Sequence, residues 1–295
     1  MADEKQAQMT QSPVDELRVG ILQTAPKFGE VESNIRRIEE LKGQLGDVDI
    51  ILTPELAING FGFGADLDYR PLHLDDNRLA SLLSSRTPIG LGFAAESELR
   101  MPYNAYAIAG DGEHRVQHKI HPVSYAPWNE HLSFESGDAV VSTQIQGARC
   151  ATVICNDMWH PSIPWLAAQT GAEVLIVPVA SIEGTNADLV QQTWQVILEH
   201  TALLLQCYVV FINRCGTDSG ATFWGRSRVV GPDGKILVQA GATEETLQAT
   251  LDLKTLRALR AQSPVLAESR HDVVVNSFNG QTASPRNKKG RTSSV

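Results

Sequence analysis

The sequence predicts an α/β fold, namely a four-layer αββα sandwich built from two internally similar halves. Three observations lead to this prediction. A strand–helix–strand unit occurs twice, each unit ends at a proline, and each is followed by a β-hairpin at nearly the same distance. Two such halves bury their apolar faces best when the two sheets pack together and the helices lie outside.

The first strand–helix–strand unit ends at Pro54. Arg18–Thr24 (RVGILQT) and Asp49–Thr53 (DIILT) are apolar runs typical of buried strands. Between them, Glu30–Gly46 predicts an amphipathic helix that stops at its final glycine. Its apolar residues at helical spacing are Ile35, Ile38, Leu41 and Leu45. Because a helix joins them, the two strands are expected to run parallel.

The second unit repeats this order and ends at Pro178. Cys150–Ile154 predicts a strand, Pro161–Thr170 a short helix and Glu173–Val177 (EVLIV) the next strand. A longer amphipathic helix, Asp188–Gln206, follows and is assigned to the same half. The second half is therefore predicted to have its own pair of parallel strands and its own helices that cover the sheet.

A β-hairpin follows each unit. Tyr103–Lys119 turns at Gly110–Gly112, and Ser227–Ala240 turns at Pro232–Gly234. An Asp-Gly pair between alternating apolar runs is a strong hairpin signal. The turn aspartates lie 57 and 55 residues after the prolines that end the two units. This agreement predicts one domain that arose by internal duplication.

Composition and charge exclude several functional classes. The chain has 295 residues, of which 42% are hydrophobic and 20% charged, which excludes a disordered or low-complexity protein. The net charge of −9 would repel phosphate backbones, so we expect no nucleic-acid partner. No apolar stretch approaches the ~18 residues of a membrane span, and we expect no membrane partner.

Both ends of the chain differ from its centre. Met1–Glu16 is polar and acidic and lacks the apolar centre of a secretory signal, so we expect a cytoplasmic protein. The basic run Arg286–Arg291 lies in a Ser-rich tail and is expected to be a solvated terminus. We therefore divide the chain into an N-terminal tail (1–17), a central domain (18–262) and a partly flexible C-terminal extension (263–295).

Several familiar catalytic and cofactor motifs are absent. The sequence has no Gly-x-Ser-x-Gly, His-Glu-x-x-His or Cys-x-x-Cys, so neither a serine-hydrolase elbow nor a zinc site is indicated. Gly60–Ala65 formally satisfies Gly-x-Gly-x-x-Ala, but no helix opens there, and a flexible glycine loop is the better interpretation. We expect no cofactor and no metal. The four cysteines, Cys150, Cys155, Cys207 and Cys215, form no disulfide framework.

Cys155 and Glu55 each directly follow a predicted strand, one in each half. Cys155 follows the apolar run Ala151–Ile154, and Glu55 follows Pro54 at the end of the first unit. Both lie where a strand ends, which is the edge at which α/β sheets place ligands. Position alone still favours a buried apolar role for Cys155 over a nucleophilic one.

Two further residues shift that balance. Lys119 ends the first hairpin in HRVQHKIHP, and Glu130 lies in PWNEHLSF. A nucleophilic thiol needs a base that takes its proton and a donor for the oxyanion that forms. A carboxylate and a lysine supply both without any histidine, so Glu55, Lys119 and Cys155 are a candidate catalytic set.

These segments resemble the nitrilase superfamily of carbon–nitrogen hydrolases from about Arg18 to Arg260. The resemblance rests on PELAINGF at the glutamate, HRVQHKIHP at the lysine, ATVICND at the cysteine and INRCG at Ile212–Gly216. SRVVGPDGKIL in the second hairpin supports it. Each motif alone is weak, whereas four in the same order and at similar separations are strong.

The resemblance implies an αββα sandwich, a homodimer or larger homo-oligomer joined through outer helices, and no cofactor. It implies a catalytic triad of Glu55, Lys119 and Cys155, with Glu130 helping to position substrate. Cys155 would form a thioester after Glu55 takes its proton, and Lys119 with the backbone N–H of Asn156 would stabilise the oxyanion. The expected substrate-binding residues are Phe61, Asn156, Trp159 and Ser181.

The resemblance leaves the substrate open among related reactions. The aromatic that often follows the cysteine is replaced by Asn156, and Pro161-Ser162 stands where Pro-Glu is usual. We favour hydrolysis of a small-molecule amide, a non-peptide carbon–nitrogen bond, to an acid and ammonia or an amine. The alternatives are a nitrilase, an N-carbamoyl amide hydrolase, or a catalytically silent interaction protein that keeps the fold.

Overall fold

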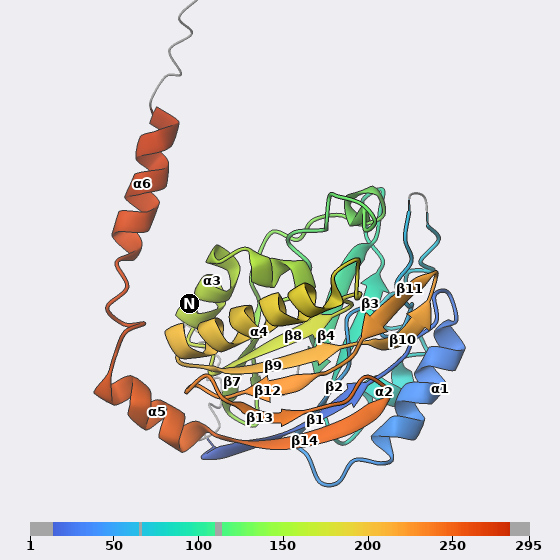
Figure 1. Ribbon diagram of the computed structural model, residues 1–295, viewed down its shortest axis with the longest axis horizontal. Coiled ribbons are helices and arrows are strands. Elements are labelled where there is room, and N and C mark those ends of the chain that lie inside the picture. The colour runs from blue at the N-terminus through green and yellow to red at the C-terminus, as the bar shows by residue number, and fades with distance from the viewer. Residues whose placement is uncertain (1–13, 65–66, 110–113, 284–295) are drawn as a thin grey trace, which may run out of the picture.

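The computed structural model describes residues 14–64, 67–109 and 114–283. Two six-stranded sheets pack face to face, and helices cover their outer faces (Figure 1). The predicted four-layer αββα sandwich is therefore confirmed. The expected turn at Gly110–Gly112, the basic run Arg286–Arg291 and nearly all of the N-terminal tail lie outside the described residues.

The first sheet is built from the N-terminal half of the chain and one strand from near its end. Its order is β14-β1-β2-β3-β4-β5. The bounds are Glu16–Gln23 for β1, Ile50–Leu52 for β2, Ile89–Ala95 for β3, Tyr103–Ala109 for β4, His114–His118 for β5 and Glu245–Asp252 for β14. β14 pairs antiparallel with all eight residues of β1, so the C-terminal half closes the edge of this sheet.

The second sheet has the order β13-β12-β9-β8-β7-β6. The bounds are Ser142–Ile145 for β6, Ala148–Thr152 for β7, Val174–Val179 for β8, Tyr208–Asn213 for β9, Arg228–Val230 for β12 and Ile236–Gln239 for β13. The second predicted hairpin is the pair β12–β13. A separate hairpin, β10 (Cys215–Asp218) and β11 (Ala221–Trp224), extends from the end of β9.

The two sheets have the same sequence of pairings. From β14 to β5, neighbouring strands pair antiparallel, parallel, parallel, antiparallel and antiparallel. From β6 to β13, the order is identical. The structure thus confirms the two similar halves that the repeated strand–helix–strand unit predicts.

The helices differ more between the halves than the strands do. The outer helices are α1 (Val31–Lys42) and α2 (Ala80–Leu83) on the first sheet, with α3 (Ser162–Gln169) and α4 (Ala187–Leu204) on the second. α1 ends four residues before the predicted stop at Gly46. The backbone N–H of Gly43 still donates to the oxygen of Glu39, but that of Gln44 donates to the oxygen of Leu41, so the chain closes there in a tighter turn. Leu45 then packs against β1 from a loop rather than from the helix.

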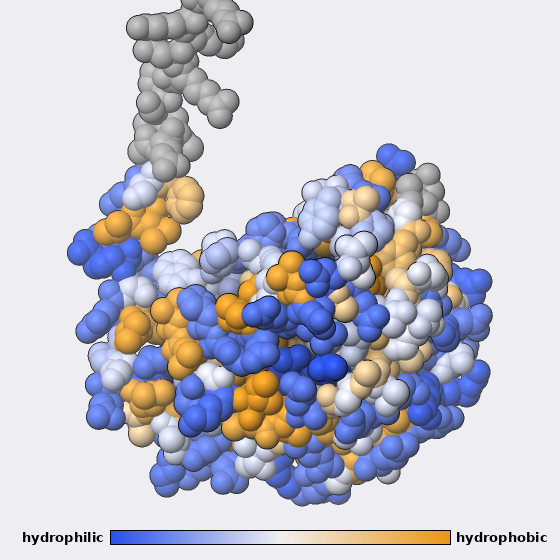
Figure 2. All heavy atoms as spheres, viewed as in Figure 1, coloured by the Kyte–Doolittle hydropathy of each residue, from blue (hydrophilic) through white to orange (hydrophobic). Residues whose placement is uncertain are grey.

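Two further helices follow the last strand. α5 is Leu253–Gln262 and α6 is His271–Ala283, and α6 stands clear of the sandwich (Figure 1). Its described side chains include the exposed apolar residues Val273, Val274, Val275 and Phe278, which colour it orange in Figure 2. Among the described helices, none is both long and apolar enough to cross a membrane.

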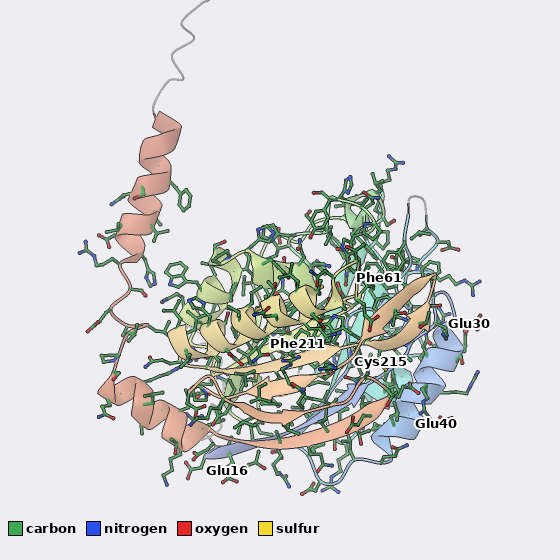
Figure 3. All side chains as sticks on the ribbon, in the orientation of Figure 1. Glu16, Glu30, Glu40, Phe61, Phe211 and Cys215 are labelled. Atoms are coloured by element: carbon green, nitrogen blue, oxygen red, sulfur yellow. The ribbon has the colours of Figure 1, made fainter. Side chains whose placement is uncertain are left out.

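Three apolar clusters account for the layers. One lies between the two sheets, one between the first sheet and α1, and one between the second sheet and α3 and α4. Strand β9 shows why both faces are apolar. Val210 and Ile212 point into the inter-sheet cluster, whereas Val209 and Phe211 point toward the helices. Phe211 is labelled beside α4 in Figure 3, and Glu40 lies on the solvent side of α1.

Candidate active site

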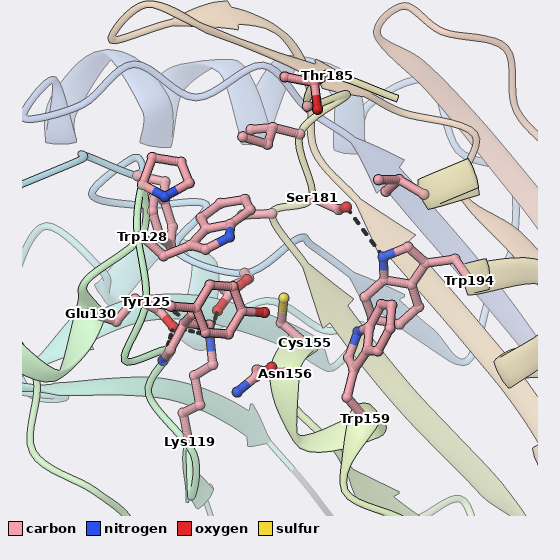
Figure 4. Close-up of a pocket in the computed structure, with 18 residues that line it drawn as sticks. Lys119, Tyr125, Trp128, Glu130, Cys155, Asn156, Trp159, Ser181, Thr185 and Trp194 are labelled. Atoms are coloured by element: carbon pink, nitrogen blue, oxygen red, sulfur yellow. Dashed lines mark hydrogen bonds and ion pairs between the residues drawn. The ribbon is translucent and has the colours of Figure 1, made fainter. Parts of the chain in front are cut away.

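The structure brings all eight predicted site residues into one cavity of about 480 Å³ (Figure 4). The cavity lies beyond the carboxyl ends of β2 and β7, the strands that precede the glutamate and the cysteine. β2 belongs to the first sheet and β7 to the second, so the face-to-face stacking of the two sheets brings the residues after these strands together. The eight are Glu55, Phe61, Lys119, Glu130, Cys155, Asn156, Trp159 and Ser181.

Glu55 is held by a tight turn after β2. Leu56, the next residue, has a φ of 50°, which bends the chain sharply. The turn rests on Gly92 of β3, where an added Cβ would lie 2.2 Å from the carbonyl oxygen of Pro54. Only glycine allows the backbone this close approach, so Gly92 fixes the place of Glu55 from behind.

Lys119 lies between the two glutamates. Its Nζ is 2.7 Å from Oε1 of Glu55, and 2.9 and 2.7 Å from Oε1 and Oε2 of Glu130. All three side chains are at most 2% exposed. An ammonium group has three N–H donors, and here all three are used by carboxylate oxygens.

Asn104 was not among the predicted site residues, yet it connects the two glutamates and the lysine. Its Nδ2 donates to Oε1 of Glu55 at 2.8 Å and more weakly to Oε1 of Glu130 at 3.4 Å. Its backbone oxygen accepts from the backbone N–H of Lys119 at 2.8 Å. The sequence signal was a lone amide inside the apolar strand β4, and by itself it named no partner.

One oxygen of Glu55 is left without a partner. Within the described part of the chain, Oε2 of Glu55 is buried and makes no hydrogen bond, whereas Oε1 accepts from Lys119 and Asn104. A buried carboxylate oxygen without a donor is costly unless a ligand or a reacting group supplies one. Oε2 is therefore the Glu55 atom available to take a proton.

Glu130 uses both of its oxygens within the protein. Oε1 accepts from Lys119 and Asn104, and Oε2 accepts from Lys119 and from the backbone N–H of Val123 at 2.8 Å. Burial raises the pKa of Glu130 while the charge of Lys119 lowers it, and the pKa stays above its ordinary value. The contacts attach Glu130 to Lys119 more firmly than to anything in the open cavity.

Cys155 begins the short 3₁₀ helix Cys155–Trp159. Its side chain packs against both the inter-sheet cluster and the cluster between the second sheet and its helices. Its φ of 46° is unusual for a residue with a side chain, and such strain gathers at functional sites. Burial, and then the negative charge of Glu55, raises the pKa of Cys155 well above its ordinary value. The resting form is therefore a thiol, and attack needs a base.

Lys119 keeps its charge. Burial by itself would lower its pKa, but the charges of Glu130 and Glu55 outweigh burial and hold the pKa of Lys119 well above its ordinary value. The cavity thus contains a permanent cation that two carboxylates hold in place.

Asp157 is a second residue that the sequence did not single out. It is buried, and its carboxylate accepts from the backbone N–H groups of Ile120 at 3.1 Å and His121 at 2.8 Å. Its neighbour Asn156 donates from Nδ2 to the backbone oxygen of His121 at 3.0 Å. The turn that carries Cys155 is therefore tied to the segment that carries Lys119.

The predicted substrate-binding residues form parts of the cavity wall. Phe61 is buried, Trp159 is 45% exposed at the rim, and the hydroxyl of Ser181 accepts from Nε1 of Trp194 at 3.2 Å. Figure 4 shows three further aromatic side chains that sequence reasoning missed: Tyr125, Trp128 and Trp194.

The other three cysteines lie outside the cavity lining. Cys150 is in the inter-sheet cluster, Cys207 is in the cluster beneath α4, and Cys215 is buried at the start of β10. Cys155, Cys207 and Cys215 are free thiols. Within residues 14–64, 67–109 and 114–283, no group of three or more His, Cys, Asp or Glu could hold a metal ion.

Known proteins resemble the chain along most of its length. The (R)-stereoselective amidase of a Pseudomonas species is 28% identical over 261 residues, covering 86% of this chain and 92% of that protein. The 2-oxoglutaramate amidase of Bacillus subtilis strain 168 is 26% identical over 264 residues, covering 86% of this chain and 98% of that protein.

Solved structures share the fold. A CN-hydrolase superfamily protein from Xanthomonas campestris has a TM-score of 0.76 at 19% identity, covering 87% of this chain and 98% of that one. An amidase from Nesterenkonia has a TM-score of 0.73 at 19% identity, covering 90% of this chain and 98% of that one. A carbon–nitrogen hydrolase family model matches residues 18–261, almost the span over which the motifs suggested this resemblance. The chain therefore belongs to the carbon–nitrogen hydrolase family.

Proposed function

We propose that this protein hydrolyses a small-molecule carboxamide to a carboxylic acid and ammonia or an amine, through a thioester on Cys155. The observation that carries the proposal is the free Oε2 of Glu55, which lines the same cavity as the Cys155 thiol and the charged Lys119. The amidase names of two relatives support the amide as substrate.

The first step forms a carbon–sulfur bond. Glu55 takes the thiol proton on Oε2 while the sulfur of Cys155 attacks the carbonyl carbon, and the carbonyl oxygen becomes an oxyanion. Base assistance is needed because the pKa of the thiol is raised, so the thiolate is scarce in the resting enzyme.

Lys119 stabilises the oxyanion. In the resting state its three donors point at the carboxylates. Once Glu55 is protonated, its hold on Lys119 weakens, and one N–H is released toward the new negative charge. The backbone N–H of Asn156, directly after the nucleophile, is the second donor that we propose.

The remaining steps return the enzyme to its starting form. The oxyanion collapses, the carbon–nitrogen bond breaks, and Glu55 gives its proton to the leaving ammonia or amine. Water, deprotonated by Glu55, then attacks the thioester carbon. The carbon–sulfur bond breaks, the acid leaves, and Glu55 returns the proton that it took from water to the Cys155 sulfur.

Glu130 acts as a positioning residue in this scheme. The resemblance implied that Glu130 helps to position substrate, but its oxygens already accept from three side-chain or backbone partners. We assign it instead to holding Lys119. Oε2 of Glu55 is the better acceptor for an amide N–H.

Ammonia release from matched amide and nitrile pairs with one acyl skeleton tests the reaction. We expect faster turnover of the amide, and none in Cys155→Ala protein. Faster nitrile turnover across several skeletons would replace the proposal with a nitrilase. Carbamoyl substrates alone would indicate an N-carbamoyl amide hydrolase, and no turnover in a broad panel would indicate a silent protein.

A covalent intermediate gives an independent test. Acid quench of the wild-type protein during turnover should trap the thioester, because protonation of Glu55 stops the hydrolytic step that needs it as a base. The intact mass after exposure to a substrate amide should increase by the acyl group. The same treatment of Cys155→Ala protein should leave the mass unchanged.

We also propose a homodimer or larger homo-oligomer. Leu189, Val196 and Leu203 recur every seven residues on α4 and are more than half exposed, which suits a helix-to-helix contact. Light scattering on the intact chain tests this, and Val196→Glu with Leu203→Glu should shift the mass to that of a monomer. The cytoplasmic location stays a prediction from the sequence.

A further inference from the structure

The cavity beside Cys155 has two aromatic walls. On one side the rings of Phe61 and Trp128 meet edge to face, with centroids 5.6 Å apart. On the other side Trp159 and Trp194 meet in the same way, also at 5.6 Å. Figure 4 shows Trp128 on one side of the Cys155 sulfur and the pair Trp159 and Trp194 on the other.

Both walls are held in place by contacts behind them. Trp194 is buried and donates from Nε1 to the hydroxyl of Ser181, which fixes its ring. Phe63 packs against both Phe61 and Trp128, at 5.3 and 5.5 Å between centroids. The space between the walls is thus a preformed slot rather than a flexible surface, and preformed apolar slots bind flat apolar groups well.

The cavity offers a carboxylate no free cation. Among its described lining residues, the charged ones are Glu55, Lys119 and Glu130. The donors of Lys119 are all used by the two glutamates, so the charged group as a whole is neutral or negative. A carboxylate on the substrate would lose its hydration without gaining a partner, which is costly.

The adjoining space continues this pattern. A second cavity of about 380 Å³ shares Pro127, Ile182 and Gly184 with the first, and its one charged lining residue among those described is an acid, Glu183. The buried Arg214 lies over the ring of Phe223 at 3.8 Å and belongs to neither lining. An extended substrate would therefore still meet no free cation.

We propose that the site takes primary carboxamides with an uncharged aromatic acyl group, held between the two aromatic walls, and rejects acyl groups that end in a carboxylate. This inference rests on the proposed amide hydrolysis and specifies its substrate class. A primary amide loses only ammonia, so the volume of the cavity is available to the acyl group.

Three amides of equal chain length separate charge from shape. Glutaramate ends in a carboxylate, 5-methylhexanamide carries an isopropyl group of similar size there, and 4-phenylbutanamide carries a ring. We expect kcat/KM to rise in that order, with glutaramate at least about tenfold below its neutral isostere. Glutaramate turnover equal to that of the isostere would overturn the exclusion of carboxylates.

The other outcomes are equally decisive. A phenyl amide no better than 5-methylhexanamide would overturn the aromatic slot while leaving amide hydrolysis intact. If none of the three releases ammonia and Cys155 in acid-quenched wild-type protein gains no acyl group from a wider amide panel, the proposed function itself fails. The two failures are therefore distinguishable.

Variants of the walls and rim test the same inference in the protein. Trp128→Leu and Trp159→Leu should lower kcat/KM for 4-phenylbutanamide more than for 5-methylhexanamide, mainly through KM. Trp165 lies on α3, outside the cavity lining, so Trp165→Leu should leave the ratio of the two kcat/KM values unchanged. If this kcat/KM ratio is unchanged in both Trp128→Leu and Trp159→Leu, the proposed binding of the ring between the aromatic walls is wrong.

A cation placed at the rim of the cavity should allow acyl groups that end in a carboxylate to bind. Thr185 lines the cavity and is exposed, so Thr185→Arg can be accommodated without repacking the core. Glutaramate turnover relative to 5-methylhexanamide should increase several-fold in Thr185→Arg, and no such gain should occur in Thr185→Gln. Equal ratios in the two variants would show that charge does not decide the specificity.

Discussion

The Asp157 carboxylate lies 2.8 Å from the backbone nitrogen of His121 and 2.9 Å from its Nδ1. Asp157 is two residues after the nucleophile, and His121 is two residues after the lysine. The pair therefore joins two segments that are far apart in the sequence. Because Asp157 is buried, the same contacts cannot be replaced by water without moving the backbone.

Asp157→Asn should lower kcat with little change in KM. The amide that replaces the carboxylate keeps the shape but loses one acceptor, so a backbone N–H of Ile120 or His121 is left unpaired. The free energy of unfolding should fall by about 1–3 kcal/mol. Kinetics at a temperature where both proteins are folded separates the two effects, with Asp75→Asn, a change at an exposed acid, as control. A variant that only lost stability would show Asp157 to be purely structural.

Cys155→Ala should abolish turnover while changing the free energy of unfolding by only ~1 kcal/mol, because a thiol is cut back to a methyl. Cys150→Ala, Cys207→Ala and Cys215→Ala should keep most activity, since none of these cysteines lines the cavity. Normal turnover by Cys155→Ala would disprove the thioester mechanism. Ammonia release and thermal unfolding of the four variants are the measurements.

Lys119→Met should reduce kcat by about 10²–10³, because the oxyanion loses its charged donor. It should also destabilise the fold by about 3–5 kcal/mol, since two buried carboxylates lose their common cation. Adding Glu130→Gln should recover part of the stability and none of the activity. Recovery of kcat in the double variant would show that Lys119 only compensates for Glu130.

The alkylation of Cys155 should depend on pH in a way that reports its raised pKa. With the pKa well above neutral pH, the thiolate fraction in substrate-free protein should increase about tenfold per pH unit between about pH 6 and pH 8. Glu55→Gln removes a negative charge that raises this pKa, so the variant should be alkylated faster at pH 7 although it hydrolyses amides more slowly. A plateau in the wild-type rate by pH 7 would contradict a resting thiol.

Gly92→Ala should impair both stability and activity. Its new Cβ would meet backbone atoms of Pro54 and Leu56 at 2.2 and 2.7 Å, which cannot move without shifting Glu55. Overpacking of this kind costs about 1–3 kcal/mol. Gly43→Ala is the matched control, because that glycine has a φ of −65° and its Cβ would lie 3.4 Å from the nearest atom. Full activity in Gly92→Ala would show that the turn tolerates displacement.

The sequence by itself determined the fold class, the two similar halves and the grouping of the candidate catalytic residues. These follow from local signals: apolar runs set strands and helices, and Glu55 and Cys155 each directly follow a strand, at the carboxyl edge where α/β sheets place ligands. Local signals did not fix the end of α1, where the apolar pattern continued through Leu45 after the helix had stopped.

Only the tertiary structure decided which atoms are free to react. Both oxygens of Glu130 are occupied and one oxygen of Glu55 is not, although each residue reads simply as an acid in the sequence. The aromatic slot likewise joins side chains at 61, 128, 159 and 194, which share no local pattern. Hydrogen-bond partners and cavity walls come from contacts between segments distant along the chain, and such contacts leave no periodicity in the sequence to be read.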